Sequence, residues 1–340
     1  MPLKKILLLG AGFSHNWGGY LASELLDRLL GRPAVMNNNY LRQKLWSKKD
    51  SGGFEVALAE VQADFRREPA AYKDHLDAFQ GAIEYVFDEM NRHFLDIPTI
   101  ETAPLFVDRL IRTHFVKYDA IFTLNQDILL DHHYLDANIH LSAPGRWDGP
   151  QIPGMQRHPP ADGNTSWGNC IWTPQQDPIQ FTVAARQQPF IKLHGSRNWR
   201  AADGGTMLVI GANKPHAIAV HPILDWYFHL FQGTLLQPDV RLVMIGYGCR
   251  DKHVNDVLIQ AVDQFGLKFY VVDPLGSGLA KAVNPTNGGP IYAPNELDHA
   301  FQSGLAGATN RPMRQIFGDD AIARGALDEF LTPNPAPGPM

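Results

Sequence analysis

Two polar side chains of this 340-residue chain have types and settings suited to chemistry. His194 lies in Lys192–Ser196 (KLHGS), after an apolar run, and an imidazole can exchange a proton near neutral pH. Asn125 lies in Thr123–Asp127 (TLNQD), and its amide can both donate and accept, which suits holding a ribose hydroxyl or a water. Two plainer interpretations stay open: a structural histidine, and a polar cap for a helix beginning near Ile128.

Two glycine turns offer a place for phosphate. Residues 10–14 (GAGFS) and 245–248 (IGYG) each follow an apolar run and precede a helical pattern. Glycines there let a backbone approach a pyrophosphate at a helix N-terminus. His15 stands where the dinucleotide fingerprint has its third glycine, and no clear acid-ended strand follows about 20 residues later, so a standard dehydrogenase is disfavoured. A tight turn without a ligand is the alternative.

Acidic residues complete the candidate set. Asp127 could accept from a hydroxyl, and Asp251 is better interpreted as a helix N-cap. Asp273 could meet a ribose hydroxyl, although a turn with Pro274 is equally plausible. The candidate binding residues are Gly10, Ala11, Gly12, Phe13, Ser14, Asp127, Gly246, Tyr247 and Asp273.

These residues follow runs that predict buried parallel strands. The runs cover residues 3–9, 118–124, 189–193, 241–245 and 268–272, and helical periodicity follows at residues 21–30 and 254–265. Strands alternating with helices predict an α/β fold with a Rossmann-like, doubly wound, mostly parallel sheet. Such sheets bind ligands beyond the carboxyl ends of their strands, where every cluster above is expected.

The predicted domain organisation is a single unit over residues 1–330. A helical insertion at residues 34–115 interrupts it and covers part of the site, with a last helix starting at Pro104. Residues 136–188 are rich in Pro, Gly, Gln and Trp and predict an irregular excursion with a short hairpin. The Pro-rich residues 331–340 predict a disordered tail.

Composition restricts the class of protein. The net charge of −5 shows no basic surplus, so no direct nucleic-acid binding is expected. No apolar stretch reaches about 18 residues, so we expect no membrane span and a cytoplasmic protein. Two cysteines, Cys170 and Cys249, cannot form a four-thiolate zinc site.

In order and identity, GAGFS, TLNQD, KLHGS and IGYG resemble the motifs of the sirtuin-like superfamily. Sirtuin-type protein deacylases usually carry a four-cysteine zinc module and continue their first loop as G-I-P-x-F-R, whereas this chain reads SHNWGG at residues 14–19. The D-x-H-x-N run at residues 251–255 is similar to the bacterial sirtuin-like domains of antiphage defence. Those domains hydrolyse NAD+ to nicotinamide and ADP-ribose.

The resemblance implies NAD+ as substrate, no zinc, and Asn125 and His194 as the catalytic pair. It implies that residues 10–14 hold the pyrophosphate region, with Asp127, Gly246 and Tyr247 nearby. A defence effector of this kind must be silent until triggered. We therefore expect a homo-oligomer, a sensor partner, or both, the partner being a helicase-type ATPase, a short Argonaute or a nucleotide-pyrophosphatase-like subunit. The helical insertion is the candidate assembly surface.

Three alternatives remain. A NAD-dependent protein deacylase would need a groove for an acylated peptide. A non-catalytic NAD- or nucleotide-sensing subunit would bind without turnover. A phosphate-binding fold unrelated to NAD requires that the four clusters do not meet in space.

Overall fold

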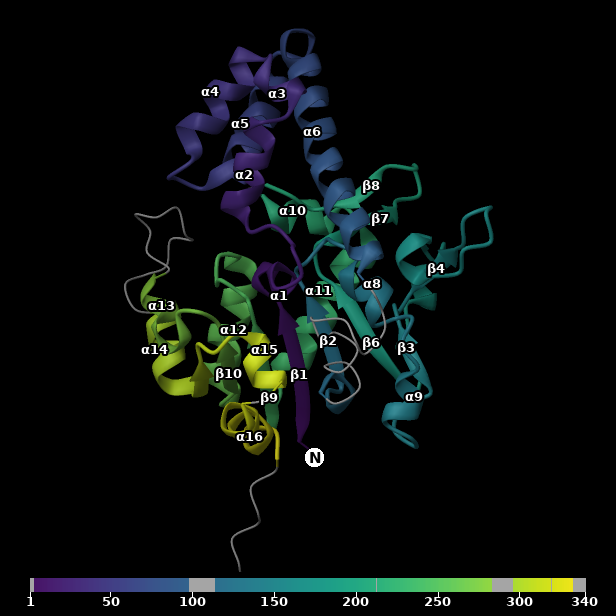
Figure 1. The fold of residues 1–340 in the computed structure, drawn as a ribbon, viewed down its shortest axis with the longest axis vertical. Coiled ribbons are helices and arrows are strands. Elements are labelled where there is room, and N and C mark those ends of the chain that lie inside the picture. The colour runs from purple at the N-terminus through teal and green to yellow at the C-terminus, as the bar shows by residue number, and fades with distance from the viewer. Residues whose placement is uncertain (1–2, 98–113, 212, 283–295, 319, 333–340) are drawn as a thin grey trace, which may run out of the picture.

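A seven-stranded sheet forms the centre of the protein, as seen in the computed structural model of Figure 1, which describes residues 3–97, 114–211, 213–282, 296–318 and 320–332. All of its strand pairs are parallel, in the order β11-β10-β9-β1-β2-β6-β3. Helices flank the sheet, so the predicted doubly wound α/β fold is confirmed. The strands are β1 (Lys4–Leu9), β2 (Ala120–Thr123), β3 (Gly149–Gln151), β6 (Gln187–Lys192), β9 (Val240–Ile245), β10 (Lys268–Val272) and β11 (Leu305–Thr309).

The central position of β1 follows from its composition. Leu7 and Leu9 are fully buried, and Leu9 pairs in register with Thr123 of β2 and Ile245 of β9. All five predicted strands are present. The sequence missed β3 and β11, because Gly-Pro-Gln and Leu-Ala-Gly-Ala-Thr contain few of the β-branched and aromatic residues that mark a strand.

Short helices and long ones connect the strands. Those outside the insertion are α1 (Ala11–His15), α2 (Ala22–Leu30), α8 (Leu129–His133), α9 (Ile139–Ser142), α10 (Lys214–Ala219), α11 (Pro222–Leu235), α12 (Lys252–Phe265), α13 (Leu279–Ala282), α14 (Glu296–Gly304), α15 (Met313–Phe317) and α16 (Ala321–Phe330). Single 3-10 turns are η1 (Phe115–Lys117), η2 (Trp167–Asn169), η3 (Pro178–Gln180) and η4 (Gly276–Gly278). Within the described ranges, no helix is both long enough and apolar enough to span a bilayer.

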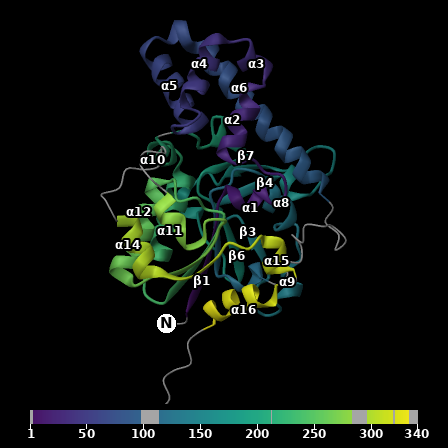
Figure 2. The ribbon, with the colours of Figure 1, turned by 60° about the vertical axis from the view of Figure 1, so that its left-hand side comes forward.

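The predicted insertion forms a helical lobe, residues 33–96. It consists of α3 (Pro33–Met36), α4 (Asn39–Lys48), α5 (Gly53–Arg67) and α6 (Pro69–Asp96). Figures 1 and 2 show the lobe beyond the carboxyl ends of the central strands, and its buried side chains join the same core as those of the sheet. The helix predicted from Pro104 lies partly outside the described residues, as does most of the predicted tail.

A smaller sheet, β4-β5-β7-β8, lies beside the main one. It contains β4 (Met155–His158), β5 (Ile171–Pro174), β7 (Gly195–Arg200) and β8 (Thr206–Leu208), and the antiparallel pair β4–β5 is the hairpin predicted in the excursion. The chain leaves β6 and enters β7 within two residues. Gly195 adopts a φ of +71° at this corner, and a Cβ there would overlap the carbonyl of Met207. The corner holds His194 at the carboxyl end of β6.

Candidate functional site

The four predicted clusters meet at one edge of the sheet. They follow β1, β2, β6 and β9, which are consecutive neighbours in the order β9-β1-β2-β6. Contacts join them in a ring: the Gly12 amide donates to the Gly246 carbonyl at 3.0 Å, and Asn125 donates to Ser14. The Gln126 side chain then reaches the His194 carbonyl at 3.5 Å, and the ring closes between His194 and His253. The interpretation that required the clusters to lie apart is therefore wrong.

The two glycine turns pack directly against one another. A Cβ on Gly10 would lie 2.6 Å from the Gly246 carbonyl oxygen, and one on Gly12 would lie 2.8 Å from the Gly246 Cα. Gly246 itself has a φ of +63°, and a Cβ there would overlap the backbone of Gly12 and Phe13. The glycines are thus required by the contact between the turns, whether or not a phosphate binds. Ala11, between them, is exposed.

Phe13 and Ser14 turn into the protein. Phe13 is fully buried, with its ring centroid 4.9 Å from that of Trp17, so its side chain belongs to the core. Ser14 is also buried, and its hydroxyl accepts a hydrogen bond of 2.8 Å from Nδ2 of Asn125. Ser14 also hydrogen-bonds the Asp127 carboxyl, whose pKa is raised by burial despite that bond and the nearby charge of Lys192. The first turn and the TLNQD segment therefore form one polar unit.

Asn125 has one half of its amide paired. The Oδ1 atom is buried, and within the described residues no hydrogen-bond partner reaches it. Asp127 has a structural task as well, since its Oδ1 accepts from the Leu129 amide at 3.0 Å at the start of α8. The predicted cap near Ile128 is confirmed, and it coexists with an Asn125 acceptor that is free to meet a ligand.

A buried lysine lies beneath this segment. Lys192 is 1 % exposed, and its Nζ donates to the Asp127 carbonyl at 2.6 Å and to Oγ of Ser196 at 2.8 Å. The same ammonium lies 2.5 Å from Oδ2 of Asp131, which is fully buried. Lys192 therefore fixes the backbone that follows β2 to the corner that follows β6.

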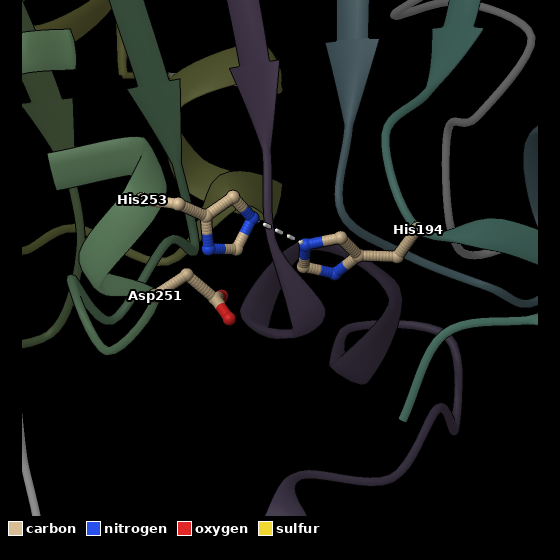
Figure 3. Close-up of side chains that lie close together, drawn as sticks. All are labelled: His194, Asp251 and His253. Atoms are coloured by element: carbon tan, nitrogen blue, oxygen red, sulfur yellow. Dashed lines mark hydrogen bonds between the residues drawn. The ribbon is translucent and has the colours of Figure 1, made fainter. Parts of the chain in front are cut away.

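His194 faces a second histidine. Its Nε2 lies 3.1 Å from Nε2 of His253, at the start of α12, and Figure 3 shows the two rings pointing toward one another with Asp251 next to them. Burial lowers the pKa of His194 to about 3 and also lowers the pKa of His253, so both rings are neutral near pH 7. Ligand atoms of His194, His253 and Asp251 lie within 4.8 Å of one another.

An ion-paired lysine lies behind Asp251. Nζ of Lys214, on α10, lies 2.7 Å from Oδ1 of Asp251 and 3.1 Å from Oε2 of Glu55, on α5. Burial alone would raise the pKa of Asp251, but the charges of Lys214 and His194 outweigh burial and lower it to about 2. Asp251 is at the N-cap position as predicted, yet its side chain makes no capping bond within the described chain, because it pairs with Lys214 instead.

The remaining predicted residues have local partners. Tyr247 is buried, and its hydroxyl donates to Oδ1 of Asn255 at 2.7 Å. The Asp273 carboxylate accepts from the Leu275 amide at 2.9 Å, which is the turn role weighed from the sequence. Both residues follow strands of the correct edge, but these contacts fix their own loops.

Sequence reasoning did not select three residues that the fold adds to the site. His253 was visible as part of the D-x-H-x-N run, although no role was assigned to it. Lys214 and Glu55 had no signal, because each lies on a separate helix and meets Asp251 only in the folded chain.

Comparison with known proteins adds no name to this site. No protein-family model matches the chain, and no curated protein is significantly similar to it.

Proposed function

We propose that this protein hydrolyses NAD+ to nicotinamide and ADP-ribose and acts as an effector of antiphage defence by NAD+ depletion. The observation that carries the proposal is the ring of contacts at the sheet edge. It joins the glycine turn, Asn125, His194 and the loop after β9 at the place where doubly wound sheets bind nucleotides. The assignment of NAD+ itself rests on the sirtuin-like motifs.

Asn125 is the residue that we assign to the ribose. An unpaired buried acceptor costs about 1–3 kcal/mol, so a site retains one where a ligand supplies the donor. Oδ1 of Asn125 is such an acceptor, while Nδ2 is held by Ser14. A ribose hydroxyl or the attacking water can donate to Oδ1, and the paired Nδ2 keeps the amide from rotating.

His194 is assigned as the proton acceptor. The bond between nicotinamide nitrogen and ribose carbon breaks with its electron pair moving to the nitrogen, which neutralises the positive ring. Water oxygen then bonds to the ribose carbon, and its proton passes to the neutral imidazole. Burial disfavours the imidazolium that forms, whereas the negative charge of Asp251 favours it.

The glycine turn supports binding from one side. The amides of Gly10 and Gly12 already donate to the carbonyls of Ile245 and Gly246. A pyrophosphate would therefore meet the turn on its exposed side, at Ala11. The helical lobe reaches the same region through the Glu55–Lys214 pair, which supports its predicted role as a cover. Control by self-association or by a sensor subunit remains part of the proposal.

The test is incubation of the purified chain with NAD+, alone and with the protein encoded beside it, followed by chromatographic identification of the products. We expect nicotinamide and ADP-ribose in equal amounts, and loss of both with Asn125→Ala or His194→Ala. Matched controls are Asn39→Ala and His299→Ala, at exposed positions on α4 and α14.

Other results would identify the alternatives. Turnover that requires an acylated peptide and releases the deacylated peptide indicates a deacylase. Binding of NAD+ by calorimetry without any product indicates a sensing subunit. Full activity in both the Asn125→Ala and the His194→Ala variants contradicts the assigned site.

A further inference from the structure

We propose that His194, His253 and Asp251 form a binding site for one divalent metal ion of the zinc class. Two imidazole nitrogens and one carboxylate oxygen are the ligands that Zn²⁺ and its first-row neighbours prefer, whereas Mg²⁺ and Ca²⁺ prefer oxygen alone. The three side chains belong to two segments distant in the sequence, and the fold brings them together across the ends of β1 and β2. The site differs from the four-cysteine module of deacylases in ligand type and in place.

The geometry fits a metal of this size. The two Nε2 atoms are 3.1 Å apart. With metal–nitrogen bonds of about 2.0–2.1 Å, that separation corresponds to an angle of roughly 100° at the metal, which a distorted tetrahedral or five-coordinate site accommodates. The third ligand atom, on Asp251, lies within 4.8 Å of both nitrogens. Small rotations of the side chains are sufficient to place all three around one ion.

The surroundings already orient the carboxylate. Lys214 donates to Oδ1 of Asp251 at 2.7 Å, and this contact leaves Oδ2 for the metal. The positive charge of Lys214 is opposed by Glu55, 3.1 Å away, which reduces the repulsion between the ammonium and a bound cation. On the other side, the His253 ring lies against Phe228, with centroids 5.4 Å apart, and this contact fixes its orientation. Such outer partners are typical of metal sites.

A consequence for activity rests on the proposed function. The lone pair on Nε2 of His194 can bind a metal ion or accept a proton, but not both. A metal on this atom therefore removes the proposed proton acceptor, and we expect Zn²⁺ to inhibit NAD+ cleavage until a chelator removes it.

Metal binding is tested without NAD+. The full chain, freed of any histidine tag and treated with EDTA, is titrated with Co²⁺ while visible absorption is recorded, and Zn²⁺ is then added. We expect one Co²⁺ per chain, displaced by Zn²⁺. Binding should weaken at least 10- to 100-fold in His253→Gln, since losing even an outer partner costs that much. The exposed His299→Gln is the matched control and should bind as the parent does.

Folding of each variant is checked by circular dichroism in EDTA, and Asp251→Asn, which can keep a hydrogen bond to Lys214, provides a second variant if His253→Gln does not fold. No Co²⁺ absorption, or equal binding by parent and both ligand variants, overturns the site. In the activity arm, Zn²⁺ that binds but leaves NAD+ cleavage unchanged or faster overturns the inhibition. A protein that never cleaves NAD+ refutes the proposed function, and the metal site is then judged by the Co²⁺ titration alone.

Discussion

The buried pair between Lys192 and Asp131 allows a test of the framework beneath the site. Lys192→Met keeps an unbranched side chain of similar length but removes the ammonium. Asp131, which is fully buried, then loses the charge that lay 2.5 Å from its Oδ2. The change also removes the donor to the Asp127 carbonyl and to Ser196.

The expected cost is large because a charge remains in the interior. Removing one partner of a buried ion pair typically destabilises a protein by about 3–5 kcal/mol. A typical domain has a total stability of about 5–15 kcal/mol, so the variant should lose a substantial part of it. The double variant Lys192→Met/Asp131→Leu leaves neither charge behind. It should therefore be more stable than the single variant, which is the sign that separates an orphaned charge from a packing defect.

The same reasoning fixes the direction of the pH dependence. Burial raises the pKa of Asp131 above its unfolded value, and the charge of Lys192 opposes that rise. A carboxyl whose folded pKa is raised binds its proton more tightly in the folded state, so stability is present at low pH and is lost as pH rises through the folded pKa. Without Lys192 the pKa rises further. The deficit of Lys192→Met should therefore be smaller at pH 5 than at pH 8.

The assay is urea unfolding followed by far-UV circular dichroism, at pH 5 and pH 8, for the parent, the single variant and the double variant. A single variant within about 1 kcal/mol of the parent at pH 8 would refute the reasoning, since the expected minimum is about 3 kcal/mol. A larger deficit at pH 5 than at pH 8 would refute the pH argument by itself.

Two further predictions concern the site. Gly246→Ala should destabilise the protein by more than the ~1 kcal/mol that a positive φ costs, because its Cβ would overlap the neighbouring turn; the control Gly233→Ala, in open space within α11, should be neutral or stabilising, and thermal unfolding compares the two. Ser14→Ala leaves Nδ2 of Asn125 without its partner, and a cost of ~1–3 kcal/mol falling on the transition state lowers kcat by roughly 5- to 160-fold; an unchanged kcat in a NAD+ cleavage assay would contradict the role given to that bond.

Local patterns were sufficient for most of the sheet and for the place of the site. The run at residues 3–9, the glycines at 10 and 12 and the helical spacing of Leu21–Leu30 predicted a strand, a turn and a helix, and the structure has all three. Parallel strands bring their carboxyl ends to one edge, so Asn125 and His194 could be predicted to share it. The strands β3 and β11 were missed because their short, weakly β-forming sequences take their structure from their neighbours.

The sequence by itself determined the fold class, the strands of the central sheet and the polar residues at their ends, because these depend on periodicity and on the direction of the chain. Only the tertiary structure decided which side chains face one another. The strand order brings His194 to His253 across 59 positions, and Gly12 to Gly246, while Lys214 pairs Asp251 with Glu55 of the helical lobe. Such partners are set by how separate elements pack, and a local pattern carries no record of that packing.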